Sequence, residues 1–318
     1  MRSHAPVNSL VSPRFSGIST FMRLPAVRTL TDVDFVVVGV PFDTGTSYRP
    51  GCRFGPRAIR EASSILKAYN PVLEVDIFEQ CAGVDYGDID IVPGYQEKSY
   101  ERITAGLAPI FASSAIPIIL GGDHSITLAT LRAAAKAHGP VSLLHFDSHS
   151  DTASEYFGER YNHGTPFYWA IEEGLINPKT SIQVGIRGPL YDGNCYDYPR
   201  QKGLEILSGW ELHDIGLERA ITRIRDKIAN TKVFLTFDID FLDAAFVPGT
   251  GTPEIGGFSS YEALKLVQAS CLGQHMIGMD LVEVLPSLDT AEITSLAACG
   301  IIHEFLSVLA CNKRGATV

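Results

Sequence analysis

The chain has 318 residues, of which 45% are hydrophobic, and its formal net charge is −10. This length and hydrophobic content suffice for a large buried core and are compatible with a single α/β domain. An acidic chain lacks the basic face that nucleic acids and anionic membranes require, so neither partner is expected. No segment is expected to provide the roughly 18 apolar residues that cross a bilayer.

The N-terminus has no continuous apolar stretch after Arg2 and His4, so no secretory signal is expected. The six cysteines are scattered and contain no C-x-x-C pair. This distribution indicates reduced thiols in a cytoplasmic protein.

Short apolar runs alternate with helical patterns along the chain. The expected strands are residues 35–40, 116–120, 141–146, 182–186, 233–237 and 276–281. The expected helices are residues 56–67, 100–113, 125–138, 217–230, 260–270 and 294–309. Continuous apolar runs are typical of strands covered on both faces, as in a parallel sheet. The alternation predicts an α/β fold with right-handed crossovers.

No repeat, low-complexity tract or linker divides the sequence, which predicts one domain over residues 31–318. Residues 1–30 lack clear periodicity, and we interpret them as an N-terminal extension that contacts another subunit.

Polar clusters follow three of the expected strands, where each strand ends. In open α/β sheets, sites form beyond the carboxyl ends of the strands. The first cluster is Gly121-Gly122-Asp123-His124, in which the glycines permit a tight turn and His124 begins the next helix. Taken alone, His124 is more often a structural histidine than a ligand.

The second cluster contains Asp147, His149 and Asp151, spaced by two residues. In an extended segment these side chains share one face, while Ser148 points away from it. Asp and Ser also serve as helix caps and turn residues. However, two carboxylates and an imidazole on one face need a cation to hold them together.

The third cluster is Asp238 and Asp240, again two carboxylates at the end of an apolar strand. The three clusters together supply four Asp and two His, which is too many ligands for one ion and suits two. Oxygen and nitrogen donors without thiolate favour Mn²⁺, with Ni²⁺ as the alternative and Fe²⁺, Co²⁺ and Zn²⁺ also compatible. Two neighbouring ions suit the activation of a water molecule.

The sequence resembles the ureohydrolases, the family of arginase and agmatinase, in GGDHS (121–125), FDSHSD (146–151) and FDIDFLDAAFVPGTGTPEIGG (237–257). The resemblance extends from about residue 12 to about residue 309. It implies a three-layer α/β/α sandwich with a mainly parallel sheet of about eight strands.

The resemblance also implies roles for the ligands. Asp147 and Asp238 would bridge the two ions, His124 and Asp151 would complete the shell of one ion, and His149 and Asp240 that of the other. His163 matches the histidine that shuttles protons near the leaving amine, although as a bare residue it is more often an ordinary loop histidine. Glu283 matches the carboxylate that binds the guanidinium.

The implied reaction is hydrolysis of a guanidino C–N bond, in which hydroxide formed on the two ions attacks and urea and an amine are released. Residues 12–25, 41–60 and 163–167 are closer to relatives such as guanidinobutyrase and agmatinase than to arginase. The expected substrate is therefore an ω-guanidino acid or agmatine rather than arginine. The same relatives are trimers or hexamers, which implies a homo-oligomer.

The segment at residues 152–161 should line the substrate mouth. Tyr156 and Phe157 are expected either to wall an apolar tail or to anchor the loop, and Arg160 either to bind a carboxylate or, as surface arginines more often do, to face solvent. Three residues depart from the family pattern near the site. Ala244 is expected to loosen a loop. Leu285 replaces a hydroxyl beside Glu283, which suggests an N-substituted guanidine or a biguanide, with neutral drift as the alternative. Ser148 is expected to have little effect.

Two other functions compete with an active amidinohydrolase. A catalytically silent subunit would keep the fold and serve assembly, and a hetero-oligomer would need a different partner chain. A deacetylase would use one Zn²⁺, which the full two-ion ligand set disfavours.

Overall fold

The computed structural model of the protein describes residues 4–315, so the ends of the predicted extension (1–3) and of the predicted domain (316–318) lie outside the described residues. Eight strands form one sheet in the order β4-β1-β5-β10-β9-β6-β7-β8, and every neighbouring pair is parallel. The strands are β1 (Phe35–Gly39), β4 (Gly83–Asp88), β5 (Ile116–Leu120), β6 (Ser142–Phe146), β7 (Ile182–Ile186), β8 (Glu205–Ser208), β9 (Lys232–Asp238) and β10 (His275–Val282).

The predicted parallel α/β sheet is confirmed, and all six predicted strands occur within two residues of their predicted bounds. The two strands of this sheet that were not predicted, β4 and β8, are its edges. An edge strand has one neighbour and tolerates polar residues and glycine, as in GVDYGD and EILS. A separate antiparallel pair, β2 (Tyr69–Asn70) and β3 (Val75–Asp76), precedes β4.

The six predicted helices are also present, and the four additional helices are short. The helices are α1 (Gly55–Ala62), α2 (Ile77–Gln80), α3 (Gln96–Phe111), α4 (Ile126–His138), α5 (Pro166–Glu172), α6 (Asp197–Lys202), α7 (Gly209–Ile215), α8 (Leu217–Ile228), α9 (Ser260–Cys271) and α10 (Ile293–Arg314). Helices of four to seven residues show too few turns for a periodic pattern, which explains why α2, α5, α6 and α7 were missed.

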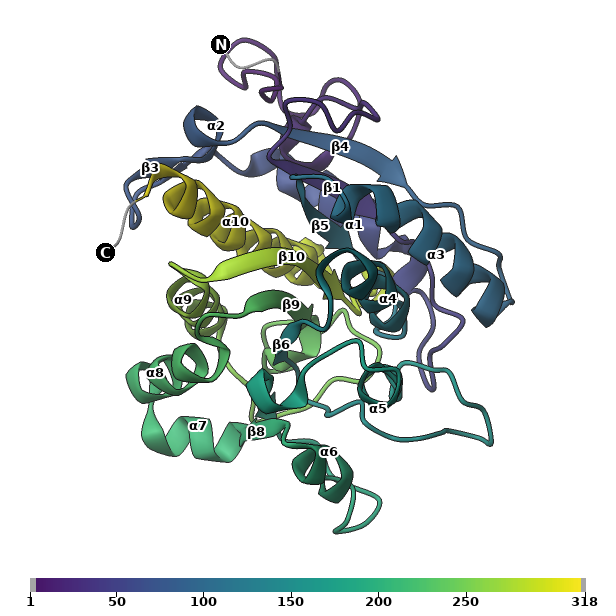
Figure 1. Ribbon diagram of the computed structural model, residues 1–318. Helices are drawn as coiled ribbons and strands as arrows, with labels where there is room; N and C mark the ends of the chain where they lie inside the picture. The colour runs from purple at the N-terminus through teal and green to yellow at the C-terminus, as the bar shows by residue number, and fades with distance from the viewer. Residues whose placement is uncertain (1–3, 316–318) are drawn as a thin grey trace.

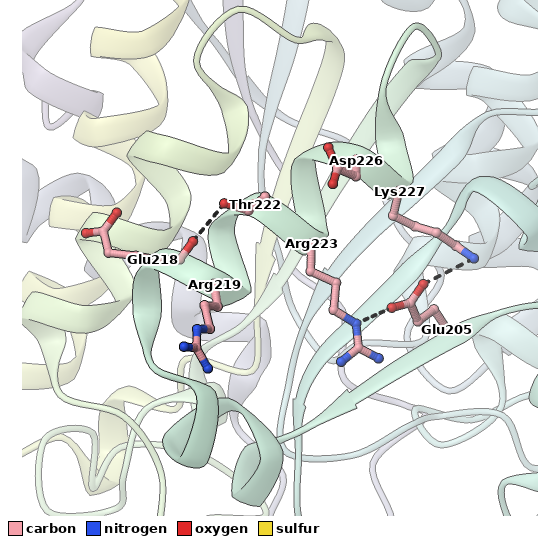
Figure 2. A pocket seen from close by; sticks show the side chains of 7 residues that line it. All are labelled: Glu205, Glu218, Arg219, Thr222, Arg223, Asp226 and Lys227. Atoms are coloured by element: carbon pink, nitrogen blue, oxygen red, sulfur yellow. Dashed lines mark hydrogen bonds and ion pairs between the residues drawn. The ribbon is translucent and has the colours of Figure 1, made fainter.

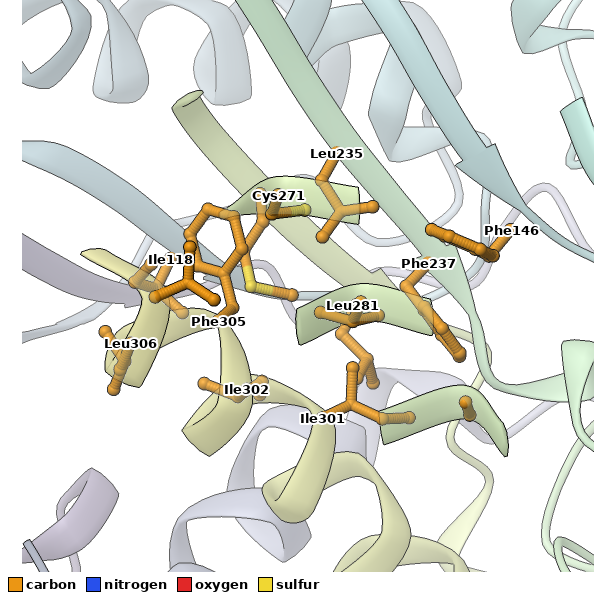
Figure 3. Packing of buried hydrophobic residues seen from close by; sticks show 14 of the residues in the cluster. Ile118, Phe146, Leu235, Phe237, Cys271, Leu281, Ile301, Ile302, Phe305 and Leu306 are labelled. Carbon is orange, nitrogen blue, oxygen red and sulfur yellow. The ribbon is translucent and has the colours of Figure 1, made fainter. Parts of the chain in front are cut away.

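The sheet lies between two layers of helices, and each layer has its own hydrophobic core (Figure 1). Helices α3, α4 and α5 pack on one face, while α1, α8, α9 and α10 pack on the other. Figure 3 shows the core between the sheet and helices α1, α8, α9 and α10. In it, Leu235 of β9 lies near Cys271 of α9 and Phe305 of α10. The three-layer α/β/α sandwich is therefore confirmed.

The last helix is long and apolar enough to cross a membrane by length and composition alone. An 18-residue window of the segment Thr290–Arg314 has a mean hydropathy of 1.7, and 67% of that window is buried inside the protein. The prediction that no segment spans a bilayer stays a prediction, because this property alone does not test it. The burial of α10 is that of a core helix, which also passes the test.

The N-terminal segment folds back on itself and is anchored to the sheet. Arg23 donates hydrogen bonds to the Ser12 carbonyl and hydroxyl at 2.9 Å each. The Phe21 N–H donates to Asp85 of β4, which also accepts two hydrogen bonds from the Arg60 guanidinium. The most exposed apolar side chains of this segment are Leu10, Val11, Phe15 and Ile18. The predicted subunit contact is compatible with this exposure and stays a prediction.

Asp85→Ala should lower the free energy of unfolding by about 3–5 kcal/mol, because it leaves the buried Arg60 guanidinium without its bidentate partner. Asp88→Ala is the matched control, since the Asp88 side chain is 46% exposed and its ion pair with Arg60 should contribute about 1 kcal/mol or less. Urea unfolding measures both. Equal losses in the two variants would contradict the anchoring role of Asp85.

Candidate metal centre

The predicted ligands come from three strands whose carboxyl ends meet at one edge of the sheet. His124 follows β5, Asp147 follows β6, and Asp238 ends β9. These strands lie in the central order β5-β10-β9-β6, and Glu283 follows the intervening β10. Parallel strands therefore bring residues that are far apart in the sequence to one place.

Three carboxylates surround one nitrogen of His124. Its Nδ1 lies 3.0 Å from Oδ2 of Asp147, 3.1 Å from Oδ2 of Asp151 and 3.2 Å from Oδ2 of Asp238. The side chains are 11% exposed or less. We call these four residues the His124 cluster.

A second cluster adjoins the first and shares Asp147 with it. His149 Nδ1 lies 3.2 Å from Oδ2 of Asp240 and 3.6 Å from Oδ1 of Asp147. We call His149, Asp147 and Asp240 the His149 cluster. All six predicted ligands are thus brought together, with Asp147 between the two groups. Asp238 uses its Oδ1 to accept the Asp240 N–H at 3.0 Å, so its bridging role stays a prediction.

Each cluster contains one buried polar atom that has no hydrogen-bond partner among the described residues: Nδ1 of His124 and Oδ2 of Asp240. Burial raises the pKa of the Asp238 carboxyl, and the charges of Asp240 and Asp147 raise it further. Burial also raises the pKa of Asp240, against the opposing charge of His149. Bound cations would partner the orphaned atoms and offset the repulsion, so these residues fit divalent metal ions.

Ser148 corrects an expectation drawn from strand alternation. Its hydroxyl donates to Oδ1 of Asp240 at 2.6 Å, so it points toward the site rather than away. The reason is that β6 ends at Phe146, and the chain then turns, with Asp151 at a φ of 51°. Asp147, His149 and Asp151 converge through this turn rather than through an extended face.

A row of buried polar side chains supports the clusters from within the sheet. Asp280, Thr236, His145 and Gln183 occupy the same register on neighbouring strands β10, β9, β6 and β7. Thr236 lies 2.8 Å from Nε2 of His124, and His145 lies 2.7 Å from Asp147. This row was not predicted from the sequence. The available signal was a polar residue within an otherwise apolar run, near its end for Asp280, Thr236 and His145 and near its start for Gln183.

His145 belongs to this supporting row and does not offer a free ligand atom. Gln183 donates to the Ser150 carbonyl at 2.6 Å, which identifies its amide nitrogen, and the same nitrogen donates to Nδ1 of His145 at 2.9 Å. The proton of His145 therefore lies on Nε2 and is donated to Asp147. Burial lowers the pKa of His145, consistent with a neutral ring. Such partners orient metal-binding carboxylates.

Glu283 and His163 form a hydrogen-bonded pair beside the clusters. Glu283 is 1% exposed, and its Oε1 accepts the His124 N–H at 2.9 Å and lies 3.0 Å from Nδ1 of His163. Burial alone would lower the pKa of His163, but the hydrogen bond to Glu283 and its charge raise it to about 9. The φ of Glu283 is 64°, an uncommon conformation that often accompanies functional positions.

Two further contacts were not predicted. The buried Cys52 thiol donates to Oε2 of Glu283 at 3.1 Å. Burial, and then the charge of Glu283, raise the pKa of this thiol. On the other side of the site, Oε1 of Glu254 lies 3.6 Å from Nε2 of His149. The Arg187 guanidinium donates to six backbone carbonyls and so fixes the loop that carries Glu254. These carbonyls belong to residues 185, 240, 241, 242, 254 and 255.

Of the two residues predicted to bind substrate at the mouth, Tyr156 lies near the clusters and Arg160 is engaged elsewhere. Tyr156 packs over Gly164, where an added Cβ would lie 2.8 Å from the tyrosine ring, and is therefore next to His163. The guanidinium of Arg160 instead stacks over the Trp169 ring, 3.5 Å from its centroid. The predicted binding role of Arg160 stays a prediction, and its stacking on Trp169 would have to break for it to reach a substrate.

A surface pocket on α8 and β8 shares no residue with the site (Figure 2). Its lining includes Glu205, which pairs with Arg223 and Lys227. These are partnered surface charges rather than a converging set of donors, so this pocket is not the candidate site.

Comparison with known proteins places these clusters in a family context. The pattern of the arginase family matches residues 33–307. Proclavaminate amidinohydrolase from Streptomyces clavuligerus is 41% identical over 301 residues, covering 94% of this chain and 96% of that protein. A solved structure of proclavaminate amidinohydrolase from the same organism matches with a TM-score of 0.90 and 40% identity, over 94% of this chain and 99% of that chain.

Two further relatives have similar identity. Guanidinobutyrase from Pseudomonas aeruginosa is 40% identical over 309 residues, which cover 96% of this chain and 97% of that protein. Mitochondrial agmatinase from Gallus gallus is 39% identical over 308 residues, which cover 97% of this chain and 90% of that protein.

Mn²⁺ should raise the unfolding temperature of chelator-treated protein, because an ion that binds only the folded state adds about 2.7 kcal/mol at a hundredfold excess over its Kd. In a chain of this size the shift should be about 4 °C. Asp238→Asn should be at least as stable as wild type without metal, since it removes a repelled carboxylate, but should respond less to Mn²⁺.

Scanning calorimetry with and without Mn²⁺ measures both effects. Asp226→Asn makes the same chemical change on the exposed side of α8 and should leave the response intact. A full Mn²⁺ response in Asp238→Asn would contradict the assignment of this cluster.

Proposed function

The chain belongs to the arginase family, and we propose that it is an amidinohydrolase that uses two divalent ions to release urea from a guanidino substrate. The observation that carries this proposal is the pair of adjoining clusters, each with an orphaned buried atom, beside the Glu283–His163 pair. A deacetylase-like site with one ion would leave the second cluster unexplained.

The proposed ligand sets follow the two clusters. His124 and Asp151 would hold one ion, His149 and Asp240 the other, and Asp147 and Asp238 would lie between them. Oxygen and imidazole donors favour Mn²⁺, with Ni²⁺ as the alternative. When bound, two such ions lower the pKa of a water molecule and stabilise negative charge that develops on the substrate.

The remaining steps fall to side chains of this chain. The Glu283 carboxylate would bind the planar guanidinium through charge-assisted hydrogen bonds, exchanging its present contacts with Cys52 and His163 for substrate N–H groups. His163 would give a proton to the leaving amine from Nδ1, which now faces Glu283. The buried position of both groups excludes bulk water and strengthens these interactions.

The proposed substrate is an ω-guanidino acid or agmatine rather than arginine. The names of three relatives at about 40% identity support this choice, since they act on such compounds or on proclavaminate-type amidines. Tyr156, beside His163, is the aromatic surface that would meet the substrate tail. The stacking of Arg160 on Trp169 leaves it poorly placed to recognise a carboxylate.

Leu285 does not provide direct support for an N-substituted guanidine or a biguanide. Its side chain is 1% exposed and packs toward Gly51, where an added Cβ would meet its Cγ at 3.4 Å. It would therefore influence the substrate through the loop that contains Gly51 and Cys52 rather than by contact.

We also propose that the protein assembles into a homo-oligomer through the N-terminal segment. Its exposed apolar side chains Leu10, Val11, Phe15 and Ile18 are held in a loop by Arg23 and are the type of surface that a second subunit covers. A trimer or hexamer is the proposed form, and copurification of a different chain would instead indicate a hetero-oligomer.

The proposed activity predicts urea release by purified protein reconstituted with Mn²⁺ or Ni²⁺. The panel should contain agmatine, 4-guanidinobutyrate, 3-guanidinopropionate, arginine, guanidine and an N-alkylated biguanide. We expect one of the first three to be the best substrate. His149→Ala should abolish turnover, and Glu283→Gln should lower kcat/KM roughly 100-fold, as the loss of about 3 kcal/mol of charge pairing requires.

Glu218→Gln is the control for charge removal, because the Glu218 side chain is 78% exposed. Metal content must be measured for every variant, since Glu283→Gln should keep its ions and His149→Ala should lose at least one. Metal-loaded wild type that releases no urea from any member would contradict the proposal and favour a silent subunit or a missing partner chain.

A further inference from the structure

Ser47 touches the side of His163 that faces away from Glu283. Its Oγ lies 2.6 Å from Nε2 of His163, and its backbone N–H donates to the same atom at 3.0 Å. The other ring nitrogen, Nδ1, lies 3.0 Å from Oε1 of Glu283. The imidazole is therefore the middle member of a line that runs from Ser47 to Glu283.

The loop that carries Ser47 is fixed at several points, so this contact is part of the folded architecture. The Gly45 N–H donates to the buried carboxylate of Asp123 at 2.7 Å, and the Gly45 carbonyl accepts the His163 N–H at 2.9 Å. On the other side of Ser47, the Gly51 N–H donates to Asp43 at 2.7 Å. Ser47 cannot move far from the ring while these bonds persist.

Exposure changes along the line from its inner to its outer end. The Glu283 side chain is 1% exposed and the His163 side chain is 12% exposed, whereas Ser47 is an exposed residue. A hydroxyl can accept a proton from Nε2 when the ring carries one there, and can donate to Nε2 when the ring does not. Ser47 thus meets solvent on one side and a titratable nitrogen on the other.

We propose that Ser47 relays protons between solvent and Nε2 of His163 during hydrolysis. This inference rests on the proposed function and adds a residue to it. Because Ser47 acts through His163, it is a positioning and relay residue rather than one that touches the reacting atoms.

The proton balance requires the relay to work in both directions. A guanidinium substrate and water give urea and an alkylammonium product, so no net proton enters or leaves. When Nδ1 gives its proton to the leaving amine, the Ser47 hydroxyl proton moves to Nε2 and solvent replaces it on Oγ, while the Ser47 N–H ceases to donate to Nε2. The ring resets when Nε2 returns its proton through Oγ and Nδ1 takes the proton lost by the attacking water.

Ser47→Ala removes the hydroxyl but keeps the backbone N–H that contacts Nε2. On the best guanidino substrate it should lower kcat about 10- to 100-fold with KM nearly unchanged, since proton transfer is impaired and binding is not. Small buffers such as imidazole should partly restore kcat in this variant, and the pH profile of kcat should shift. Ser47→Thr should recover most of the activity. Thr46→Ala is the matched control, because its hydroxyl bonds the Asp43 carbonyl instead.

NMR spectroscopy can detect the contact between Ser47 and His163 without turnover. In protein labelled with ¹⁵N-histidine, Ser47→Ala should move the ring nitrogen resonances of His163, assigned with His163→Asn, whereas Thr46→Ala should not. Unchanged resonances in Ser47→Ala would overturn the contact. Active wild type with the same kcat, pH profile and buffer response in Ser47→Ala would overturn the relay. Wild type without activity on any guanidine would instead overturn the proposed function itself.

Discussion

Four aspartates and two histidines lie against one another at the carboxyl edge of the sheet, with Asp147 shared between the two groups. Burial of this much negative charge is the constraint on which the rest of the site depends. The imidazoles of His124 and His149 offset part of it, yet Nδ1 of His124 and Oδ2 of Asp240 remain without hydrogen-bond partners among the described residues. Divalent ions resolve this imbalance because they bring positive charge and accept the lone pairs of the carboxylate oxygens and imidazole nitrogens that converge here.

The sheet helps to hold this concentration of charge by orienting two of the candidate ligands, His124 and Asp147, through side chains within the sheet. Polar side chains in register on four neighbouring strands occupy positions that an ordinary parallel sheet fills with apolar residues. Thr236 contacts His124, and His145 donates to Asp147 in a tautomer that Gln183 fixes. These contacts set the directions of the ligand atoms, so the buried row and the clusters form one unit.

The central architecture and the clustering of the six candidate ligands were predictable from the sequence because apolar strands and the polar residues at their ends are local signals. The edge strands and short helices were not, since their patterns are weak. Strand alternation failed for Ser148, because the chain turns directly after β6. The contacts of Cys52 with Glu283 and of Ser47 with His163 join residues more than one hundred positions apart. No local pattern encodes such contacts, and only the folded loop reveals them.

Anomalous X-ray diffraction from Mn²⁺-soaked crystals, collected at the manganese absorption edge, would test the central claim most directly. We expect two strong anomalous peaks on opposite sides of the Asp147 carboxylate. One should lie next to His124 and Asp151, and the other next to His149 and Asp240. A single peak, or none at this edge of the sheet, would contradict the assignment of the two clusters as a paired metal centre.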